Sequence, residues 1–250
     1  MNQEALELLR TGELEPLGRL ISASNASFYC ALHPVPSTGS GPRSDPPDAE
    51  EHPRACVYKP VRGERPLIDF PRRTLSRREV AAYLVSEASG WDIVPPTVFR
   101  DGPAGPGMVQ LWIEIDEAID PVELIRAGDP ALRRMAVFDA VVNNADRKVG
   151  HLLPVGGGHV YGVDHGICFS PDPKLRTVLW NWRGQPITMA EREVLQRLSN
   201  ELAGRLGEVL TEYLAPIEIA ATRARLSDLL IGGCLPQPDP DRPAIPWPPY

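Results

Sequence analysis

Asn143-Asn144-Ala145-Asp146-Arg147-Lys148 follows a predicted helix, and Val163-Asp164-His165-Gly166 follows a predicted strand 18 residues after Asp146. Each stretch places one aspartate in a loop directly after a regular element. Phosphoryl transfer needs one carboxylate near the attacking hydroxyl and another that holds a metal ion. The order and spacing of the two stretches therefore predict a phosphoryl-transfer site in a cleft between them.

The upstream sequence supplies a cation for the same chemistry. A predicted strand over residues 56–61 carries Lys59, and residues 76–89 predict a helix that carries Glu79. A strand lysine can contact a triphosphate, and a helix carboxylate can hold that lysine in position. Ser76 and Glu79 also fit a capping box, so the sequence leaves two roles open for Glu79.

A run of small residues lies between two predicted strands, 18–22 and 28–32. Small polar residues favour tight turns, and the backbone N–H groups of such a turn can contact phosphate oxygens. The sequence therefore predicts a phosphate-contacting turn. Its candidate residues are Ser24, Asn25, Ala26 and Ser27.

The rest of the chain predicts an α+β fold with two lobes. Strands dominate up to residue 113, including a hairpin over 97–113, and helices are expected at 130–142, 190–214 and 216–230. We expect a small β-rich N-lobe over residues 1–113, a helical C-lobe over 114–235 and a proline-rich tail over 236–250. Six prolines and two glycines between residues 34 and 53 predict a mobile insertion in the N-lobe.

Composition excludes several classes of protein. The chain has 250 residues and a formal net charge of −7, which argues against a general nucleic-acid binder. Its four cysteines form no CxxC pair, so a zinc ribbon is not expected. The sequence has no apolar run long enough for a transmembrane segment, and its acidic N-terminus does not resemble a signal peptide. We therefore expect a cytoplasmic protein.

These motifs together resemble the protein-kinase-like fold, in its HipA and phosphatidylinositol 3-/4-kinase branch. They are most similar to an actinobacterial family of phosphatidylinositol-kinase-like proteins. The resemblance implies an ATP-dependent phosphotransferase that uses Mg²⁺. It implies that Lys59 contacts the α/β-phosphates and that Glu79 pairs with Lys59. It also implies that Asp146, with Arg147 beside it, is the catalytic carboxylate and that Asp164 binds the metal. The implied hinge residues that hold adenine are Gln110, Leu111, Trp112 and Ile113.

One position departs from the kinase pattern. Kinases place a second metal ligand, usually asparagine, five residues after the catalytic aspartate, and here that residue is His151. Because magnesium prefers oxygen ligands, an imidazole there leaves three interpretations open. The residue can bind Mn²⁺, contact a phosphate as a cation, or indicate weakened catalysis. The last interpretation leaves a pseudokinase open, a nucleotide-binding or nucleotide-free module that regulates a partner. A kinase-fold enzyme that transfers AMP is a further alternative. The acceptor can be an alcohol on a protein, a lipid headgroup or a small molecule.

Overall fold

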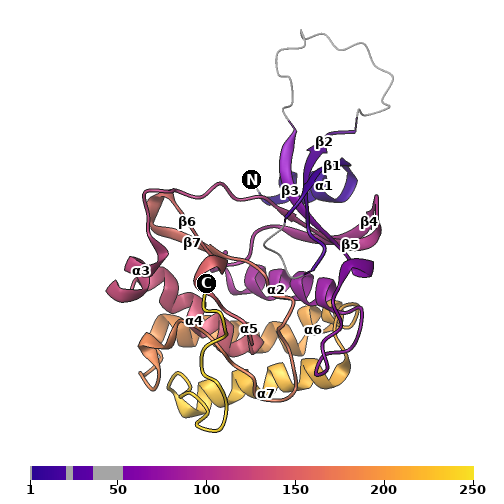
Figure 1. Ribbon diagram of the computed structural model, residues 1–250. Coiled ribbons are helices and arrows are strands. Elements are labelled where there is room, and N and C mark those ends of the chain that lie inside the picture. Colours follow the sequence, from indigo (N-terminus) through magenta and orange to yellow (C-terminus); the bar gives the residue numbers. More distant parts are fainter. Residues whose placement is uncertain (1, 21–24, 36–52) are drawn as a thin grey trace, which may run out of the picture.

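A five-stranded antiparallel sheet forms the upper part of the molecule in Figure 1. The computed structural model describes residues 2–20, 25–35 and 53–250. The sheet order is β1-β2-β3-β5-β4, so β3 lies in the middle and β5 separates β3 from β4. The strands are β1 (Glu13–Arg19), β2 (Phe28–His33), β3 (Arg54–Pro60), β4 (Thr97–Gly102) and β5 (Gly105–Leu111).

Helix α2 (Leu75–Ser89) lies between this sheet and the helices below it (Figure 1). It contacts β4 and β5 on one side and α5 and α6 on the other. Because both sides are covered, even its charged residues Arg78 and Glu79 are buried. Arg78 donates to the carbonyl of Cys168 at 2.6 Å and pairs with Glu218, which ties the helix to the lower part of the molecule. Helix α1 (Asn2–Thr11) packs against β2, β4 and β5.

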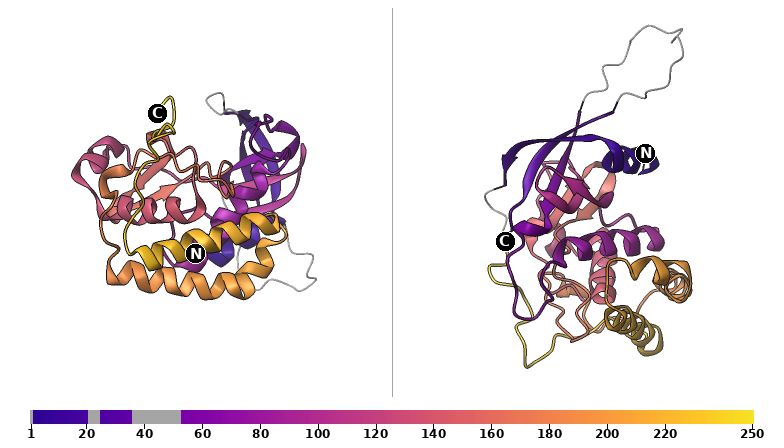
Figure 2. Two further views of the ribbon diagram at one scale, coloured as in Figure 1. Left: turned by 90° about the horizontal axis from the view of Figure 1, so that it is seen from below. Right: turned by 90° about the vertical axis from the view of Figure 1, so that its right-hand side faces the viewer.

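The lower part is mainly helical, and the views in Figure 2 separate it from the sheet. A short antiparallel hairpin, β6 with β7, stands at its upper edge and pairs Leu152 with Gly162. The helices and strands of this part are α3 (Pro121–Ala127), α4 (Pro130–Val142), β6 (Leu152–Val155), β7 (His159–Gly162), α5 (Met189–Ala203), α6 (Arg205–Leu210) and α7 (Pro216–Gly232). Together the sheet and the helices form the two-lobed α+β arrangement that the sequence predicts.

Several expected boundaries are wrong in detail. The first strand is β1, which begins at Glu13 and ends at Arg19 rather than spanning residues 18–22. The helix expected over 190–214 is broken at Gly204, whose φ of −114° and ψ of −129° interrupt the helical path. The predicted hairpin is present with a shorter turn, because β4 and β5 close at Gly102 and Gly105. Most of the insertion expected at 34–53 lies outside the described residues.

Residues 236–250 lie along the surface of the helical part (Figure 1). The carbonyl of Ala244 accepts hydrogen bonds from Thr177 N at 3.1 Å and from Trp180 Nε1 at 2.8 Å. The carbonyl of Pro249 accepts from Val149 N at 2.9 Å. Proline removes backbone donors but keeps the carbonyl, so a proline-rich segment can bind through its acceptors.

The start of α2 is held by a carboxylate from the preceding loop. Glu64 accepts hydrogen bonds from Leu75 N at 3.1 Å, Ser76 N at 2.8 Å and Ser76 Oγ at 2.7 Å. The predicted capping box is therefore wrong: the N-cap position is Thr74, and Glu79 points elsewhere. A carboxylate at a helix N-terminus satisfies free N–H groups and complements the helix dipole.

We expect Glu64→Ala to lower the free energy of unfolding by about 1–2 kcal/mol, because the first turn of α2 then loses its acceptor. Urea unfolding followed by circular dichroism measures this change. The exposed Glu117, replaced in the same way, is the control. A loss below about 0.5 kcal/mol for Glu64→Ala would show that the bonds to Glu64 contribute little.

No helix in the described part of the chain is both long and apolar enough to cross a bilayer.

Candidate functional site

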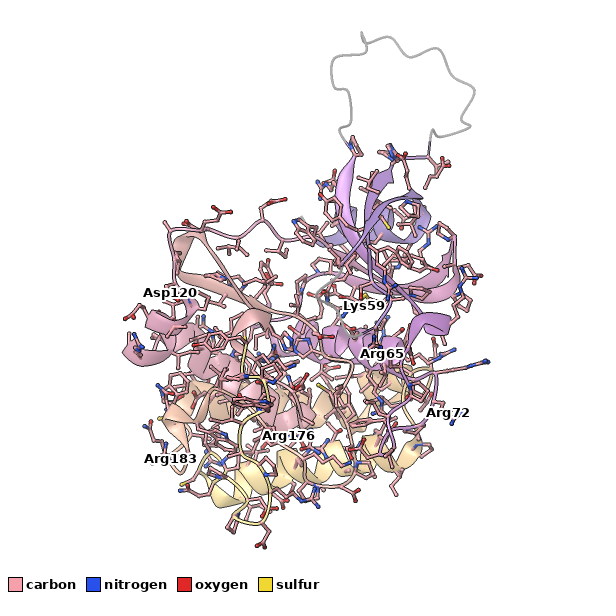
Figure 3. All side chains as sticks on the ribbon, viewed as in Figure 1. Lys59, Arg65, Arg72, Asp120, Arg176 and Arg183 are labelled. Atoms are coloured by element: carbon pink, nitrogen blue, oxygen red, sulfur yellow. The ribbon has the colours of Figure 1, made fainter. Side chains whose placement is uncertain are left out.

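Lys59 lies between two carboxylates that come from distant parts of the chain. In β3 the side chains of Cys56 and Tyr58 face the core, so Lys59 points to the opposite side of the sheet. Its Nζ donates to Glu79 Oε1 at 2.7 Å and to Asp164 Oδ1 at 2.9 Å. Figure 3 labels Lys59 where the sheet meets the lower part of the molecule. The structure thus brings together three of the residues singled out in the sequence.

The three side chains differ in their exposure to water. The exposed fractions are 14% for Lys59, 3% for Glu79 and 47% for Asp164. Glu79 is therefore an internal support for the lysine, whereas Asp164 can still reach a ligand in solvent. Glu79 Oε2 is buried and lacks a hydrogen-bond partner among the described residues.

Charge and burial compete at this cluster. Burial disfavours the charged form of Lys59, but the carboxylates of Asp164 and Glu79 outweigh it and raise the pKa of the ammonium. Lys59 holds the pKa of Asp164 well below its usual range. Burial raises the pKa of Glu79 to about 7, although Lys59 opposes the shift. Lys59 and Asp164 are consequently charged at neutral pH, which is the state that phosphate and metal binding require.

The loop after α4 carries Asp146. Helix α4 ends at Val142 and is capped by Asn143, whose φ of 54° lies in the left-handed region that asparagine tolerates. Asn144 Oδ1 accepts from Asp146 N at 3.0 Å and so fixes the backbone of the aspartate. Burial raises the pKa of Asp146, and the charge of Asp164 acts in the same direction.

Lys148 is a site residue that the sequence reasoning missed. Its Nζ lies 3.4 Å from Asp146 Oδ2, and its side chain is 19% exposed. The signal was present in the sequence, because a lysine two residues after Asp146 in the same loop brings a second cation close to that carboxylate. Lys148 and Lys59 therefore bring two positive charges to the two aspartates.

Arg147 is expected beside Asp146 in catalysis, but the structure places its side chain away from solvent. Its guanidinium forms two bonds with Asp139, at 3.0 and 2.9 Å, and both side chains are 0% exposed. It also donates to the carbonyl of Val163 at 3.1 Å and lies 2.6 Å from His165 Nε2. The geometry makes Arg147 a positioning residue that connects the Asp146 loop with the Asp164 loop.

The predicted phosphate turn is only partly described, since Ser24 lies outside the described residues. Ala26 N already donates to the carbonyl of Gly63 at 3.0 Å, and Asn25 Oδ1 accepts from Arg65 N at 2.8 Å. Ser27 is buried, and its hydroxyl lies 3.4 Å from the Asn25 carbonyl. These bonds attach the turn to residues 63–65 and leave its role with phosphate a prediction.

The predicted hinge residues lie at and just beyond the end of β5, which ends at Leu111. Gln110 is buried and donates to Thr97 Oγ1 at 2.8 Å, so its side chain faces the core. Leu111 N donates to the carbonyl of Pro96, and Trp112 N to that of Ala55. Within the part of the chain that the structure describes, Ile113 N makes no hydrogen bond, which leaves it as a free donor.

His151 lies against the metal-binding candidate Asp164. Its Nε2 is 3.5 Å from Asp164 Oδ2, and its Nδ1 lies 3.4 Å from Lys148 N. Burial lowers the pKa of His151 to about 4 and outweighs the opposing charge of Asp164. The imidazole is therefore neutral at pH 7.

The pKa of His151 predicts a specific dependence of stability on pH. A buried neutral histidine with a lowered pKa binds fewer protons in the folded state than in the unfolded state. The free energy of unfolding is therefore highest above pH 6.5 and decreases as the pH falls toward 4. We expect the wild type to lose up to about 3 kcal/mol relative to His151→Gln across this range. Chemical unfolding at pH 7 and pH 4.5 measures the difference, with His33→Gln as the control. An equal decrease in the free energy of unfolding for the wild type and for His151→Gln would contradict the lowered pKa of His151.

The kinase resemblance of the sequence implies a divalent metal, and the donors present fit one that is shared with a ligand. No three His, Cys, Asp or Glu side chains converge to form a complete metal cage among the described residues. Mg²⁺ is commonly held by one or two carboxylates together with phosphate oxygens and water. The half-exposed Asp164 and the 23%-exposed Asp146 suit that arrangement.

The arrangement of the two lobes defines a kinase-like fold, and comparison with a solved structure supports that class. The crystal structure of the proinflammatory kinase CtkA from Helicobacter pylori matches with a TM-score of 0.52 and covers 91% of this chain and 94% of the other. Because the sequences are only 11% identical, this likeness shows a shared fold alone.

A second comparison identifies the family. Protein Rv2133c of Mycobacterium tuberculosis is 44% identical to this chain over an alignment that covers 97% of this chain and 94% of the relative. The chain therefore belongs to the same family as protein Rv2133c. No protein-family model matches the sequence.

Proposed function

We propose that this protein is an ATP-dependent phosphotransferase whose acceptor is an alcohol. The observation that carries the proposal is Lys59, held at 2.7 Å from Glu79 and 2.9 Å from Asp164 in a kinase-like fold. A buried carboxylate that fixes a strand lysine beside a half-exposed aspartate is the arrangement needed to bind a triphosphate and its metal.

Each residue has a distinct part in the proposal. Lys59 contacts the α/β-phosphates, and Glu79 keeps the lysine in place. Asp164 holds Mg²⁺, which would neutralise charge on the phosphates when bound. Asp146 orients the acceptor hydroxyl and accepts its proton, and Lys148 offsets negative charge beside it. The chain thus contributes position and charge rather than covalent chemistry.

The assignment to the HipA and phosphatidylinositol 3-/4-kinase branch is also part of this proposal. It supports a protein serine, a lipid headgroup or a small alcohol as acceptor, without selecting one. A shared fold does not determine the substrate.

His151 favours a second candidate, a pseudokinase that binds nucleotide and regulates a partner. By sequence count His151 is the fifth residue after Asp146, where kinases usually have an asparagine, and its neutral imidazole lies 3.5 Å from Asp164. Mn²⁺ accepts imidazole more readily than Mg²⁺ does, so the two metals distinguish weak from absent catalysis.

Incubation with α- or γ-labelled ATP tests the proposal. We expect label to move from the γ-position to an acceptor or to water in the presence of Mg²⁺ or Mn²⁺. Transfer of the α-label would instead establish AMP transfer. Stoichiometric nucleotide binding without movement of either label, across serine peptides, inositol lipids and small alcohols, would support the pseudokinase.

A further inference from the structure

A cavity of about 620 Å³ lies between the tail and the lower part of the molecule, outside the Lys59 site. Residues 236–244 cover one side of it, and α7, the end of α4 and residues 173–176 form the others. Its apolar wall includes Ala140, Leu175 and Leu229. Pockets of roughly 300–1,000 Å³ hold small organic ligands, so this cavity has the size of a ligand site.

Two arginines face this cavity without a carboxylate partner within the described ranges. Arg225 donates to the carbonyls of Val141 at 3.0 Å and Ser170 at 3.1 Å and to Thr222 Oγ1 at 2.8 Å. Burial lowers its pKa to about 10. Arg176, labelled in Figure 3, donates through Nε to the carbonyl of Ala145 at 2.9 Å and forms no ion pair with another described residue.

The other charges of the cavity wall largely cancel. Lys174 pairs with Asp69 at 2.6 Å, and Arg242 lies 3.6 Å from Asp239. The remaining acid, Asp228, is exposed on α7 and pairs with neither arginine. The wall therefore carries a small net positive charge, and neither Arg176 nor Arg225 forms an ion pair within the described ranges, although the charge of Arg176 acts to lower the pKa of Asp69 and of Asp146. A partly buried charge without an ion-pair partner is destabilising, and a bound anion would relieve that cost.

We propose that this cavity binds a small amphipathic anion. The anionic group contacts Arg225 and Arg176, and the apolar part packs against Leu175, Leu229 and Ala140. Neither part suffices alone: an inorganic anion leaves the apolar wall wet, and a neutral apolar molecule leaves the guanidinium groups without a counter-ion.

Hydrogen bonds connect the cavity wall to the Asp146 loop, so we expect the ligand to affect that loop. This regulatory part of the proposal rests on the proposed function. Arg176 N donates to the carbonyl of Asn144, and the carbonyl of Arg176 accepts from Arg147 N. The tail that covers the cavity continues to Pro249, which holds Val149 N in the same loop. A ligand that orders the cavity wall therefore orders both attachments of the loop.

Cys234 provides a readout that requires no nucleotide. It is exposed and lines the cavity, whereas Cys30, Cys56 and Cys168 are buried. The test compares octyl phosphate, octanol and inorganic phosphate as probes and follows alkylation of Cys234 by iodoacetamide with mass spectrometry. Octyl phosphate is expected to slow alkylation at least about fivefold, while the other two probes leave the rate unchanged. Equal protection by octanol or by inorganic phosphate, or no protection by any probe, would overturn the site.

Two variants keep the test independent of folding defects. Arg225→Gln is expected to weaken octyl phosphate binding about tenfold, because it removes a charged hydrogen bond. Ala244→Phe narrows the cavity while keeping the Ala244 backbone carbonyl, and it should reduce protection without lowering the melting temperature. Arg205→Gln, an exposed arginine on α6, is the matched control. Unchanged protection in both variants would contradict the assignment.

Hydrogen exchange tests the regulatory part separately. Octyl phosphate is expected to slow amide exchange in the peptide that covers residues 143–151, in protein without nucleotide. Binding without slower exchange would overturn the coupling and leave the cavity as a ligand site alone. Because neither readout needs ATP, failure of the phosphotransferase proposal would not alter these outcomes.

Discussion

Asp164→Asn is expected to abolish transfer of the γ-phosphate, with a loss of at least about 10³-fold in kcat. The substitution removes the negative charge that would hold the metal, but it preserves the shape of the side chain. Because Glu79 still pairs with Lys59 at 2.7 Å, the lysine stays in place. Turnover of γ-labelled ATP measures the effect.

The melting temperature of the nucleotide-free protein serves as the internal control for this variant. Asp164 is 47% exposed, so its loss should change stability little. Asp172→Asn, an exposed aspartate in a neighbouring loop, should retain full turnover. Normal turnover in Asp164→Asn would contradict the proposed role of the residue.

Asp139→Ala is expected to lower the free energy of unfolding by about 3–5 kcal/mol, because it leaves Arg147 charged and buried without a carboxylate partner. Both side chains are 0% exposed, and their two bonds lie at 2.9 and 3.0 Å. Arg147 also contacts Val163 and His165, so the loss should loosen both aspartate loops. Urea unfolding and hydrogen exchange measure the two effects.

The double variant Asp139→Leu with Arg147→Met separates the charge from the packing. It removes both charges together, and we expect it to be more stable than Asp139→Ala. We expect phosphate transfer to be impaired in the double variant as well, because no ion pair then connects the Asp146 loop with the Asp164 loop. A double variant that is less stable than Asp139→Ala would show that packing, not the uncompensated charge, dominates.

The order of the motifs along the chain is enough to predict the fold and the cluster of Lys59, Glu79 and Asp164. The glutamate on α2 lies 20 residues after the lysine on β3, and the aspartate after β7 lies 105 residues after that lysine. Only a fold that stacks these elements brings the three together, so their order carries information that no single motif has. Burial of both sides of α2 then decides the role of Glu79.

Other features depend on contacts that the sequence does not show. Glu64 caps α2 from 11 residues away, which local capping rules do not anticipate. Arg147 follows Asp146 in the sequence, but its partner Asp139 lies in the preceding helix α4. The bonds to Asp139 hold the Arg147 side chain in the interior. The path of the tail depends on carbonyl acceptors, and proline content alone does not predict where those carbonyls bind.

Thermal melting with nucleotide tests the central claim most directly. The protein is melted with ATP and Mg²⁺, with ATP and Mn²⁺, and without ligand, alongside Lys59→Ala. A ligand at 100 times its Kd stabilises the folded state by about 2.7 kcal/mol. We expect a metal-dependent rise in melting temperature that disappears in Lys59→Ala. A melting temperature that no combination of nucleotide and metal changes would contradict a nucleotide site at Lys59.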